Sequence, residues 1–186
     1  MGNESNEDTA STNERSRWQG GLDNTDWSKT RVKFASKWIK SGSKVADLGC
    51  GTQILAYSID ASCEYTGFDI GKMNSKNILI DLNIDFDLGG VFDTAILLGV
   101  LEYLQDPFGT LESLNSKVDE LIISYVFSKN SNPKTIDKRT SIGVLNHFNE
   151  QEFLSRLGSL GLSVMEKEII WNREEDKHVI FYLEWR

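Results

Sequence analysis

The chain of 186 residues contains 39% hydrophobic and 26% charged residues, a composition typical of a globular domain. Its formal net charge is −8 and its Lys and Arg residues are dispersed, which disfavours a nucleic-acid partner because phosphate binding needs clustered cations. No apolar run approaches the roughly 20 residues that span a bilayer, and the polar N-terminus lacks the apolar segment of a secretory signal. With two cysteines and two histidines, we expect a cytoplasmic protein with reduced thiols, no membrane span and no metal site.

The chain is expected to consist of a short tail and one domain. Residues 1–17 are polar and aperiodic, which predicts a disordered tail. Residues 18–186 form the single domain. Within it, residues 18–42 predict an N-terminal helical cover, because apolar side chains recur at helical spacing from Asp26 onward and a glycine ends the pattern. Basic residues alternate with the apolar ones between Lys29 and Lys40, so we expect them on the solvated face of this helix.

From residue 44 onward, apolar strands alternate with amphipathic helices. One helix begins with Asp106 as its N-cap and Pro107 at its first position. The last helix begins with a capping box formed by Asn149 and Glu152. Between these two helices, the polar segment 128–148 is expected to be a loop. The strands are expected at 44–48, 65–70, 78–82, 92–98, 120–126, 162–171 and 178–185, and a further short helix at 53–58.

This alternation predicts an α/β fold. Unbroken apolar strands between helices indicate a parallel sheet that is covered on both faces. The last two strands are joined by a charged turn, which predicts an antiparallel hairpin. We therefore expect a doubly wound, mostly parallel seven-stranded sheet with helices on both faces and a C-terminal antiparallel hairpin. Ligands of such sheets bind at the carboxyl ends of the strands, here where the strand order reverses between the first and fourth strands.

A glycine turn follows the first strand. Gly49 and Gly51 permit a tight turn and let the backbone approach a ligand closely. Asp47 precedes the turn, where its carboxylate can accept hydrogen bonds from a cationic amine, directly or through water. A nicotinamide cofactor requires G-x-G-x-x-G spacing at this place, and the turn lacks both that third glycine and the lysine of a phosphate-binding loop. A nicotinamide-dependent reductase is therefore disfavoured.

The segment Asp47-Leu-Gly-Cys-Gly-Thr resembles motif I of the class I, Rossmann-like S-adenosylmethionine-dependent methyltransferases, whose usual form is D/E-x-G-x-G-x-G. In that family the glycine turn lies against the methionine part of the cofactor. The resemblance therefore implies S-adenosylmethionine as the cofactor, with Asp47, Gly49 and Gly51 in its site. Gln53 stands where the last glycine of the motif usually falls. The resemblance extends from about Trp27 to the C-terminus.

An acid also ends the second expected strand. Asp69 follows Asp47 by about 20 residues, the usual distance to a carboxylate that binds a ribose diol. The segment Tyr65-Thr-Gly-Phe-Asp69 resembles the second motif of the methyltransferase family, which implies that Asp69 holds the ribose and that Ile70 packs against the adenine. The alternative is that Asp69 only caps the following turn.

The third expected strand ends near Asp81 and Leu82. In the family, an acid at this place often accepts the adenine amino group, and the next backbone N–H meets a ring nitrogen. The resemblance implies these two roles for Asp81 and Leu82. Asp85 and Asp87 compete with Asp81, which is alternatively a solvated turn acid.

The segment Phe92–Leu104 resembles the stretch that follows the fourth strand in the family, with Tyr103 where histidine is frequent. This resemblance implies that Leu98 and Gly99 lie over the cofactor. Glu102 and Tyr103 would then face the substrate as catalytic candidates. Alternatively, Glu102 only holds the local loop and Tyr103 only packs.

His147 lies at the end of the polar segment 128–148, which is expected on the substrate side of the domain. The sequence from Asn146 to Leu154 resembles the entry to the last large helix of the family. A neutral histidine near the substrate opening can serve as a general base. The alternative is a purely structural histidine.

The resulting prediction is a methyltransferase in which the methyl group is displaced directly from the sulfonium. We expect a small-molecule acceptor, preferably an oxygen, because no Asn-Pro-Pro-Tyr signature of amine acceptors stands at Leu98–Leu101. A protein partner is compatible with the sequence. The alternative from another class is a catalytically inert, methyltransferase-like binding or scaffold subunit.

Overall fold

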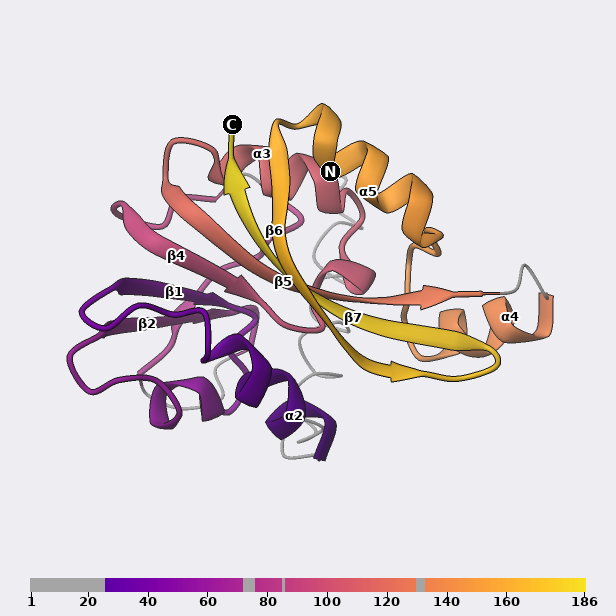
Figure 1. The fold of residues 1–186 in the computed structure, drawn as a ribbon, viewed down its shortest axis with the longest axis horizontal. Coiled ribbons are helices and arrows are strands. Elements are labelled where there is room, and N and C mark those ends of the chain that lie inside the picture. Colours follow the sequence, from indigo (N-terminus) through magenta and orange to yellow (C-terminus); the bar gives the residue numbers. More distant parts are fainter. Residues whose placement is uncertain (1–25, 72–75, 85, 130–132) are drawn as a thin grey trace, which may run out of the picture.

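The computed structural model describes residues 26–71, 76–84, 86–129 and 133–186 (Figure 1). The tail 1–17 and the first part of the expected helical cover therefore lie outside the described residues, as does Asp85. In the part of the chain that is described, no helix is both long and apolar enough to cross a membrane.

A seven-stranded sheet forms the centre of the molecule (Figure 1). Its order is β3-β2-β1-β4-β5-β7-β6. Neighbours from β3 to β5 run parallel, whereas β7 runs antiparallel to both β5 and β6. The predicted mostly parallel sheet with a C-terminal hairpin is thus confirmed. The strands are β1 (Lys44–Leu48), β2 (Glu64–Asp69), β3 (Ile78–Leu79), β4 (Phe92–Leu97), β5 (Val118–Ser128), β6 (Leu162–Asn172) and β7 (Asp176–Trp185).

The strand order reverses between β1 and β4. From β1 the chain builds the sheet outward to β2 and β3, and from β4 it builds outward to β5 and the hairpin. The crossovers on the two sides therefore leave in opposite directions, which opens a crevice at the carboxyl ends of β1 and β4. This is the predicted switch point.

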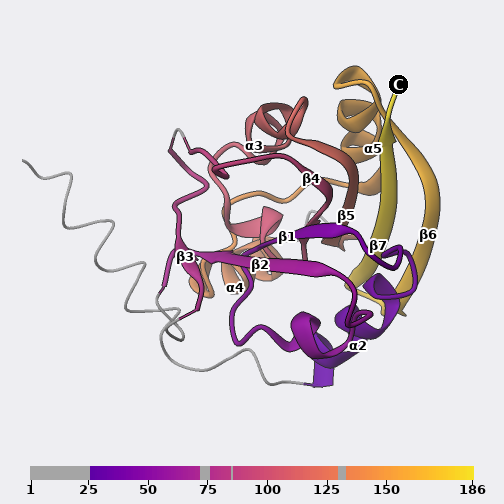
Figure 2. The ribbon, with the colours of Figure 1, turned by 90° about the vertical axis from the view of Figure 1, so that its left-hand side faces the viewer.

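Helices cover both faces of the sheet (Figure 2). On one face, α2 (Asp26–Ala35) and the 3-10 helix η2 (Ile54–Tyr57) pack over the apolar side chains of β1, β4, β5 and β7. On the other face, α3 (Pro107–Leu114) and α5 (Glu150–Ser159) pack over a larger core that is rich in aromatic rings. The crevice thus lies between two helical layers.

Both predicted helix starts are confirmed. Asp106 Oδ1 accepts a hydrogen bond from the N–H of Gly109 at 2.9 Å, and Pro107 is the first residue of α3. Asn149 Oδ1 accepts one from the N–H of Glu152 at 2.9 Å at the start of α5. These side chains satisfy amide groups that a helix start leaves unpaired.

Three elements differ most in length from their predictions. The strand expected at 78–82 stops at Leu79, because it is an exposed edge strand and the chain turns at Asp81, whose Oδ1 accepts from the N–H of Asn83 at 3.0 Å. The strand expected at 120–126 extends to Ser128, because β7 pairs with it along this whole length. The helix α2 ends at Ala35, and turns connect it to β1.

The segment 128–148 is not wholly the loop that was expected, because residues Pro133–Ser141 form helix α4. Its sequence carries few apolar side chains, so no helical period marks it. Pro133 occupies the first helical position, where its missing N–H costs no hydrogen bond. Arg139 joins α4 to the sheet, since its Nη2 donates to the carbonyl oxygen of Val126 at 2.9 Å.

Candidate functional site

The glycine turn joins the ends of β1 and β2. Gly49 and Gly51 both have positive φ, +77° and +47°, a region that favours glycine. The N–H groups of Gly49 and Cys50 both donate to the carbonyl oxygen of Phe68, at 2.8 and 3.0 Å. A Cβ atom on Gly49 would lie 2.4 Å from Val100 Cγ2. Conformation and packing together therefore require glycine at Gly49.

Gln53 keeps the backbone conformation of the glycine that it replaces in the motif. Its φ is +60°, in the left-handed region that glycine adopts without strain. Its side chain is buried, and Nε2 donates to Cys50 Sγ at 3.9 Å. A Cβ atom on Gly67 would lie 2.9 Å from both Cys50 Sγ and Gln53 Nε2. The glutamine thus fills space beside the turn without changing the path of the backbone.

Asp69 links the end of β2 to the glycine turn. Its Oδ2 accepts from the N–H of Gly51 at 2.9 Å, and its Oδ1 accepts from the N–H of Gly71 at 2.9 Å. The side chain is almost fully buried. A carboxylate has about four acceptor positions, so each oxygen retains capacity for a ligand hydroxyl.

Asp47 is buried at the end of β1 and accepts a hydrogen bond from the hydroxyl of Tyr65 at 2.6 Å. Burial and the Asp47 carboxylate raise the pKa of Tyr65, so the hydroxyl stays protonated and remains the donor. Burial, Asp47 and Asp69 raise the pKa of Cys50 to about 12, which keeps its thiol neutral and disfavours a nucleophilic role.

A cavity opens between the glycine turn and α2. Sequence reasoning missed Arg31 in this cavity, because the basic residues of α2 were expected on a solvated face. That expectation is wrong for Arg31, whose guanidinium lies against Gly99: a Cβ atom there would lie 2.3 Å from Nη1. The cavity is lined by Ser28, Arg31, Val32, Asp47, Gly49, Cys50, Gly51, Thr52, Ile54, Leu55 and Leu98.

The residues expected at the adenine lie around β3. Pairing of β3 with β2 brings Asp81 near Asp69, since the N–H of Ile80 donates to the carbonyl oxygen of Asp69 at 3.0 Å. Asp81 is half-buried, whereas Leu82 is buried and joins the core under α3. Ile70 is half-buried directly after β2.

The competing acid Asp87 is engaged elsewhere. It is exposed, and its Oδ1 accepts from the N–H of Gly89 at 3.1 Å and from Lys117 Nζ at 3.4 Å. These two donors lower the pKa of Asp87. This carboxylate therefore has local partners at the surface.

Glu102 and Tyr103 belong to a short 3-10 helix, η3 (Leu101–Tyr103), after β4. Glu102 is 3% exposed, and its Oε1 accepts from the N–H of Val126 at 2.9 Å. Within the described residues, its Oε2 has no hydrogen-bond partner. Burial raises the pKa of Glu102, although the charges of Arg31 and Arg139 oppose this effect. One carboxylate oxygen of Glu102 is thus bonded to β5, and the other has no partner among the described residues. Tyr103 is half-buried.

His147 is held by two residues of α4. Its Nδ1 accepts from Arg139 Nε at 3.2 Å, and its Nε2 lies 3.4 Å from Thr140 Oγ1. Burial and the charge of Arg139 lower the pKa of His147. Since His147 does not line the cavity, its role as a general base stays a prediction.

The comparison with protein families matches residues 23–167 to the model of a methyltransferase domain. No curated protein sequence matches the chain.

Solved structures share its fold at low sequence identity. The 1,6-didemethyltoxoflavin-N1-methyltransferase of Burkholderia thailandensis, with bound 1,6-didemethyltoxoflavin and S-adenosylhomocysteine, has a TM-score of 0.72 at 14% identity, covering 96% of this chain and 88% of that chain. The magnesium protoporphyrin IX methyltransferase of Synechocystis PCC 6803, with bound S-adenosylhomocysteine, has a TM-score of 0.64 at 20% identity, covering 95% and 97%. A chain from a Haloferax volcanii complex that contains the Trm112 methyltransferase activator has a TM-score of 0.66 at 15% identity, covering 96% of both chains.

Proposed function

The chain belongs to the methyltransferase-domain family of S-adenosylmethionine-dependent enzymes, and on this premise we propose that it transfers the sulfonium methyl group to a small-molecule acceptor. Direct displacement needs the acceptor atom in line with the carbon–sulfur bond, so positioning supplies much of the rate. The observation that carries this proposal is the cavity at the switch point, where the glycine turn meets one carboxylate, Asp47, and one guanidinium, Arg31.

We assign this cavity to the amino-acid end of the cofactor. That end is a zwitterion with an ammonium and a carboxylate group. Asp47 suits the ammonium, directly or through water, and Arg31 suits the carboxylate, because charge-assisted hydrogen bonds of both kinds are strong. The backbone at Gly49 and Gly51 would lie against the chain of the methionine. Arg31 Nε, which has no partner among the described residues, would gain one from the ligand.

The nucleoside end of the cofactor extends along the carboxyl edge toward β3. Asp69 would accept from the ribose hydroxyls through the acceptor positions that Gly51 and Gly71 leave open. Ile70, Asp81 and Leu82 would surround the adenine, in keeping with the family resemblance.

The acceptor would bind beyond Leu98 and Gly99, where the methyl group points. Glu102 and Tyr103 follow directly on η3, and α2 and the segment 128–148 would cover this side of the site. Of the three catalytic candidates, Glu102 is supported by a buried oxygen without a partner among the described residues, whereas both nitrogens of His147 lie near residues of α4.

An oxygen atom of a small molecule is the acceptor that we favour. The chain has Leu98–Leu101 in place of an amine-type signature after β4. The names of two enzymes with this fold, for 1,6-didemethyltoxoflavin and magnesium protoporphyrin IX, support a small molecule but not the choice of oxygen, because the first is an N1-methyltransferase. A protein partner is a further proposal, supported by the related fold in the complex with the Trm112 activator.

Calorimetric titration with S-adenosylhomocysteine tests the cofactor site. We expect binding by the unaltered chain and a loss of about tenfold in affinity in Arg31→Gln, the effect of losing one strong charge-assisted hydrogen bond. Lys33→Gln, an exposed change on the same helix, is the matched control and should bind normally. Absence of heat with the unaltered chain would favour the inert scaffold. Transfer of a tritiated methyl group to small hydroxyl compounds then tests the acceptor class.

A further inference from the structure

The other histidine, His178 of β7, is fully buried. Among the described residues, neither of its ring nitrogens has a hydrogen-bond partner. A buried polar group without a partner loses its hydration and gains nothing in return, so native structures rarely keep one. Burial, followed by the charge of Arg31, lowers the pKa of His178 to about 3, so its imidazole is neutral at physiological pH. His178 therefore destabilises the unliganded fold, and a ligand that forms a hydrogen bond with its imidazole would remove this destabilisation.

His178 lies on the same face of the sheet as the cofactor cavity. Side chains alternate along a strand, and Ile180, two residues further on, packs in the apolar cluster under α2. The pair Val126–His178 lies two residues nearer the carboxyl end of β5 than the pair Ser124–Ile180. Ser124 Oγ accepts from the N–H of Gly99 at 2.8 Å. Ile180, Ser124 and His178 therefore lie along one face of the sheet, close to Gly99, where the methyl group of the cofactor is expected.

The charged side chains at this edge make hydrogen bonds with groups other than His178. Glu102 Oε1 accepts from the N–H of Val126, and Arg139 Nη2 donates to the carbonyl oxygen of Val126. These two contacts provide hydrogen-bond partners for the backbone of Val126, which lies beyond the last residue of β5 that pairs with β4. Arg31 Nη2 donates to Ser28 Oγ at 3.3 Å. The imidazole thus remains a neutral donor and acceptor beside charged groups that are only partly engaged, since Arg31 Nε and Glu102 Oε2 have no partner among the described residues.

Aromatic rings lead from the surface to His178. The Trp171 ring meets the imidazole edge to face, with centroids 4.3 Å apart, and Trp27 meets Trp171 in the same way at 4.4 Å. The guanidinium of Arg173 lies 4.9 and 5.0 Å from the centroids of Trp27 and Trp171. Trp27 is 44% exposed. These edge-to-face rings form an apolar cover over one polar group.

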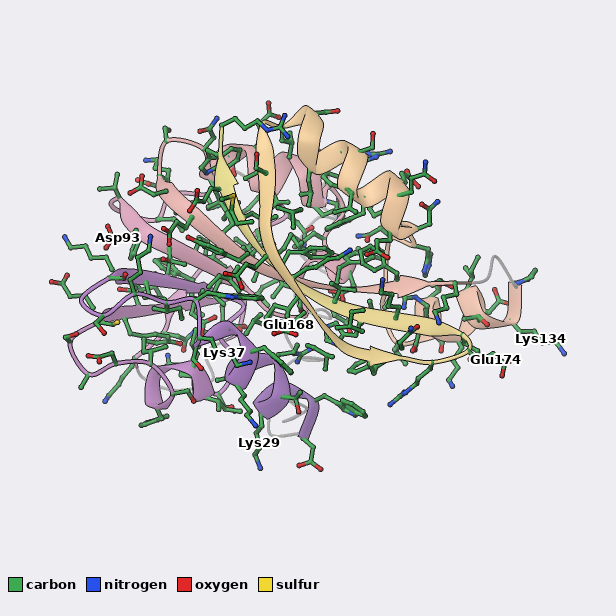
Figure 3. All side chains as sticks on the ribbon, viewed as in Figure 1. Lys29, Lys37, Asp93, Lys134, Glu168 and Glu174 are labelled. Atoms are coloured by element: carbon green, nitrogen blue, oxygen red, sulfur yellow. The ribbon has the colours of Figure 1, made fainter. Side chains whose placement is uncertain are left out.

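Helix α2 spans both the cofactor cavity and this aromatic cover. Arg31 lines the cavity, and Trp27, one helical turn earlier, packs against Trp171 of β6. Beyond the other end of α2, Lys37 approaches Glu168 of β6, with Nζ and Oε1 3.9 Å apart (Figure 3). Contacts with the hairpin thus lie near the start of α2 and just beyond its end.

On the basis of the proposed function, we propose that His178 hydrogen-bonds the methyl acceptor and that this acceptor is a phenol. The aromatic ring of the phenol would lie against Trp27 and Trp171, and its oxygen would meet the imidazole. A neutral imidazole suits a hydroxyl group or its anion as a partner. The charge of Arg31 favours an ionised oxygen and disfavours a cationic amine.

The transfer step follows from this placement. The phenol releases its proton to water, and the N–H of His178 donates to the resulting phenolate oxygen. A lone pair of that oxygen forms the new oxygen–carbon bond as the carbon–sulfur bond breaks. The electron pair of the broken bond stays on sulfur, which turns the sulfonium into the neutral thioether of S-adenosylhomocysteine. His178 is therefore a residue that binds and orients the acceptor.

Titration with 4-nitrophenol tests this proposal, at the pH where the free probe is half ionised and with and without S-adenosylhomocysteine. We expect the unaltered chain to bind the probe and to increase its nitrophenolate absorbance. His178→Leu should weaken binding about tenfold, the usual effect of one lost hydrogen bond to a charged group. His178→Gln, which keeps a donor and an acceptor, should restore most of the affinity. Nitrobenzene, the ring without the hydroxyl, should bind the unaltered chain and His178→Leu equally.

Further measurements separate this role from a structural one. S-adenosylhomocysteine affinity should be unchanged in His178→Leu, and its melting temperature should be equal or higher because an unpaired buried group is removed. If His178→Leu does not fold, Trp27→Leu at the exposed end of the cover is the second variant, with weaker probe binding expected. No 4-nitrophenol binding by the unaltered chain, or equal affinity in the folded variants, overturns the proposal. Failure of S-adenosylhomocysteine to bind would instead refute the proposed function. Because 4-nitrophenol is also titrated without S-adenosylhomocysteine, the two outcomes can be distinguished.

Discussion

At the residue scale, Asp69 stabilises the glycine turn and retains acceptor positions that a ligand could use. Its two oxygens accept from the N–H groups of Gly51 and Gly71, which join the glycine turn to the end of β2. The turn-capping role and the ribose role are therefore compatible, because they use different acceptor positions of the same carboxylate.

Replacing Asp69 by alanine is expected to weaken S-adenosylhomocysteine binding by about 1.5–3 kcal/mol, the usual value for hydrogen bonds to a charged group. Calorimetry measures this change. Asp87→Ala is the matched control, since that carboxylate is exposed and bonds to Gly89 and Lys117. Equal affinities of a folded Asp69→Ala variant and the unaltered chain would refute the ribose assignment.

The lowered pKa of His178 predicts how the free energy of unfolding depends on pH. Its folded-state pKa is lowered to about 3, whereas an unfolded histidine has a pKa of about 6.5. As the pH falls from about 6.5 toward 3, the unfolded chain takes up a proton that the folded imidazole does not, so stability falls in this window. Above about pH 6.5 this contribution is constant.

Denaturant unfolding at several pH values measures this slope, and His178→Leu should reduce it. The slope that remains in the variant belongs to His147, whose pKa is also lowered, and to the carboxylates. Imidazole NMR signals provide the check. A His178 signal that titrates near pH 6.5 in the folded chain would contradict the buried, neutral imidazole.

At the scale of elements, we propose that α2 and residues 133–148 cover the acceptor side of the proposed site. The helix α2 presents Ser28, Arg31 and Val32 to the cavity and Trp27 to the hairpin. In the segment 128–148, α4 is tied to β5 through Arg139. Covers of this kind commonly close over bound ligands and exclude water from the reaction.

Hydrogen exchange with and without S-adenosylhomocysteine tests this closure. We expect added protection in α2 and in residues 133–148, because ligand contacts would hold both covers in place. The helix α3 on the opposite face is the internal control and should exchange unchanged. If protection rises only around Gly49, Asp69 and Asp81, both covers stay open, and the acceptor binds an open cleft or is presented by a partner protein.

At the scale of the whole molecule, the site combines residues from both ends of the chain. The antiparallel insertion of β7 beside β5 brings His178 to the carboxyl edge, and β6 then brings Trp171 under Trp27 of α2. A ligand in this region therefore links α2 to the C-terminal hairpin, and its binding should stabilise the fold globally.

S-adenosylhomocysteine at 100 times its dissociation constant is expected to stabilise the fold by about 2.7 kcal/mol. For a chain of this size, that corresponds to a rise of roughly 5–11 °C in melting temperature. Thermal unfolding measures the shift, with NADPH as the control that should leave it unchanged. A shift in melting temperature with NADPH alone would favour a nicotinamide-dependent reductase. No shift with either compound would favour the inert scaffold.

The sequence by itself determined the features that follow short-range rules. The strand–turn–acid pattern around Asp47 and Gly49 identified the family and the doubly wound fold, which the family match and the sheet topology bear out. The N-caps at Asp106 and Asn149 and the final hairpin were also predictable. Each of these depends on residues within a few positions of one another, because caps, turns and strand alternation are local.

Only the tertiary structure decided which side chains meet. The basic pattern of α2 predicted a solvated face, yet Arg31 lies against Gly99 and lines the cavity. The sequence offered His147 as a catalytic candidate, with a structural histidine as the alternative, and gave no sign that His178 is fully buried without a partner among the described residues. Gln53 keeps the left-handed backbone of a glycine because its side chain has buried space beside Gly67. These outcomes depend on packing between segments far apart in the chain, and no local pattern encodes that packing.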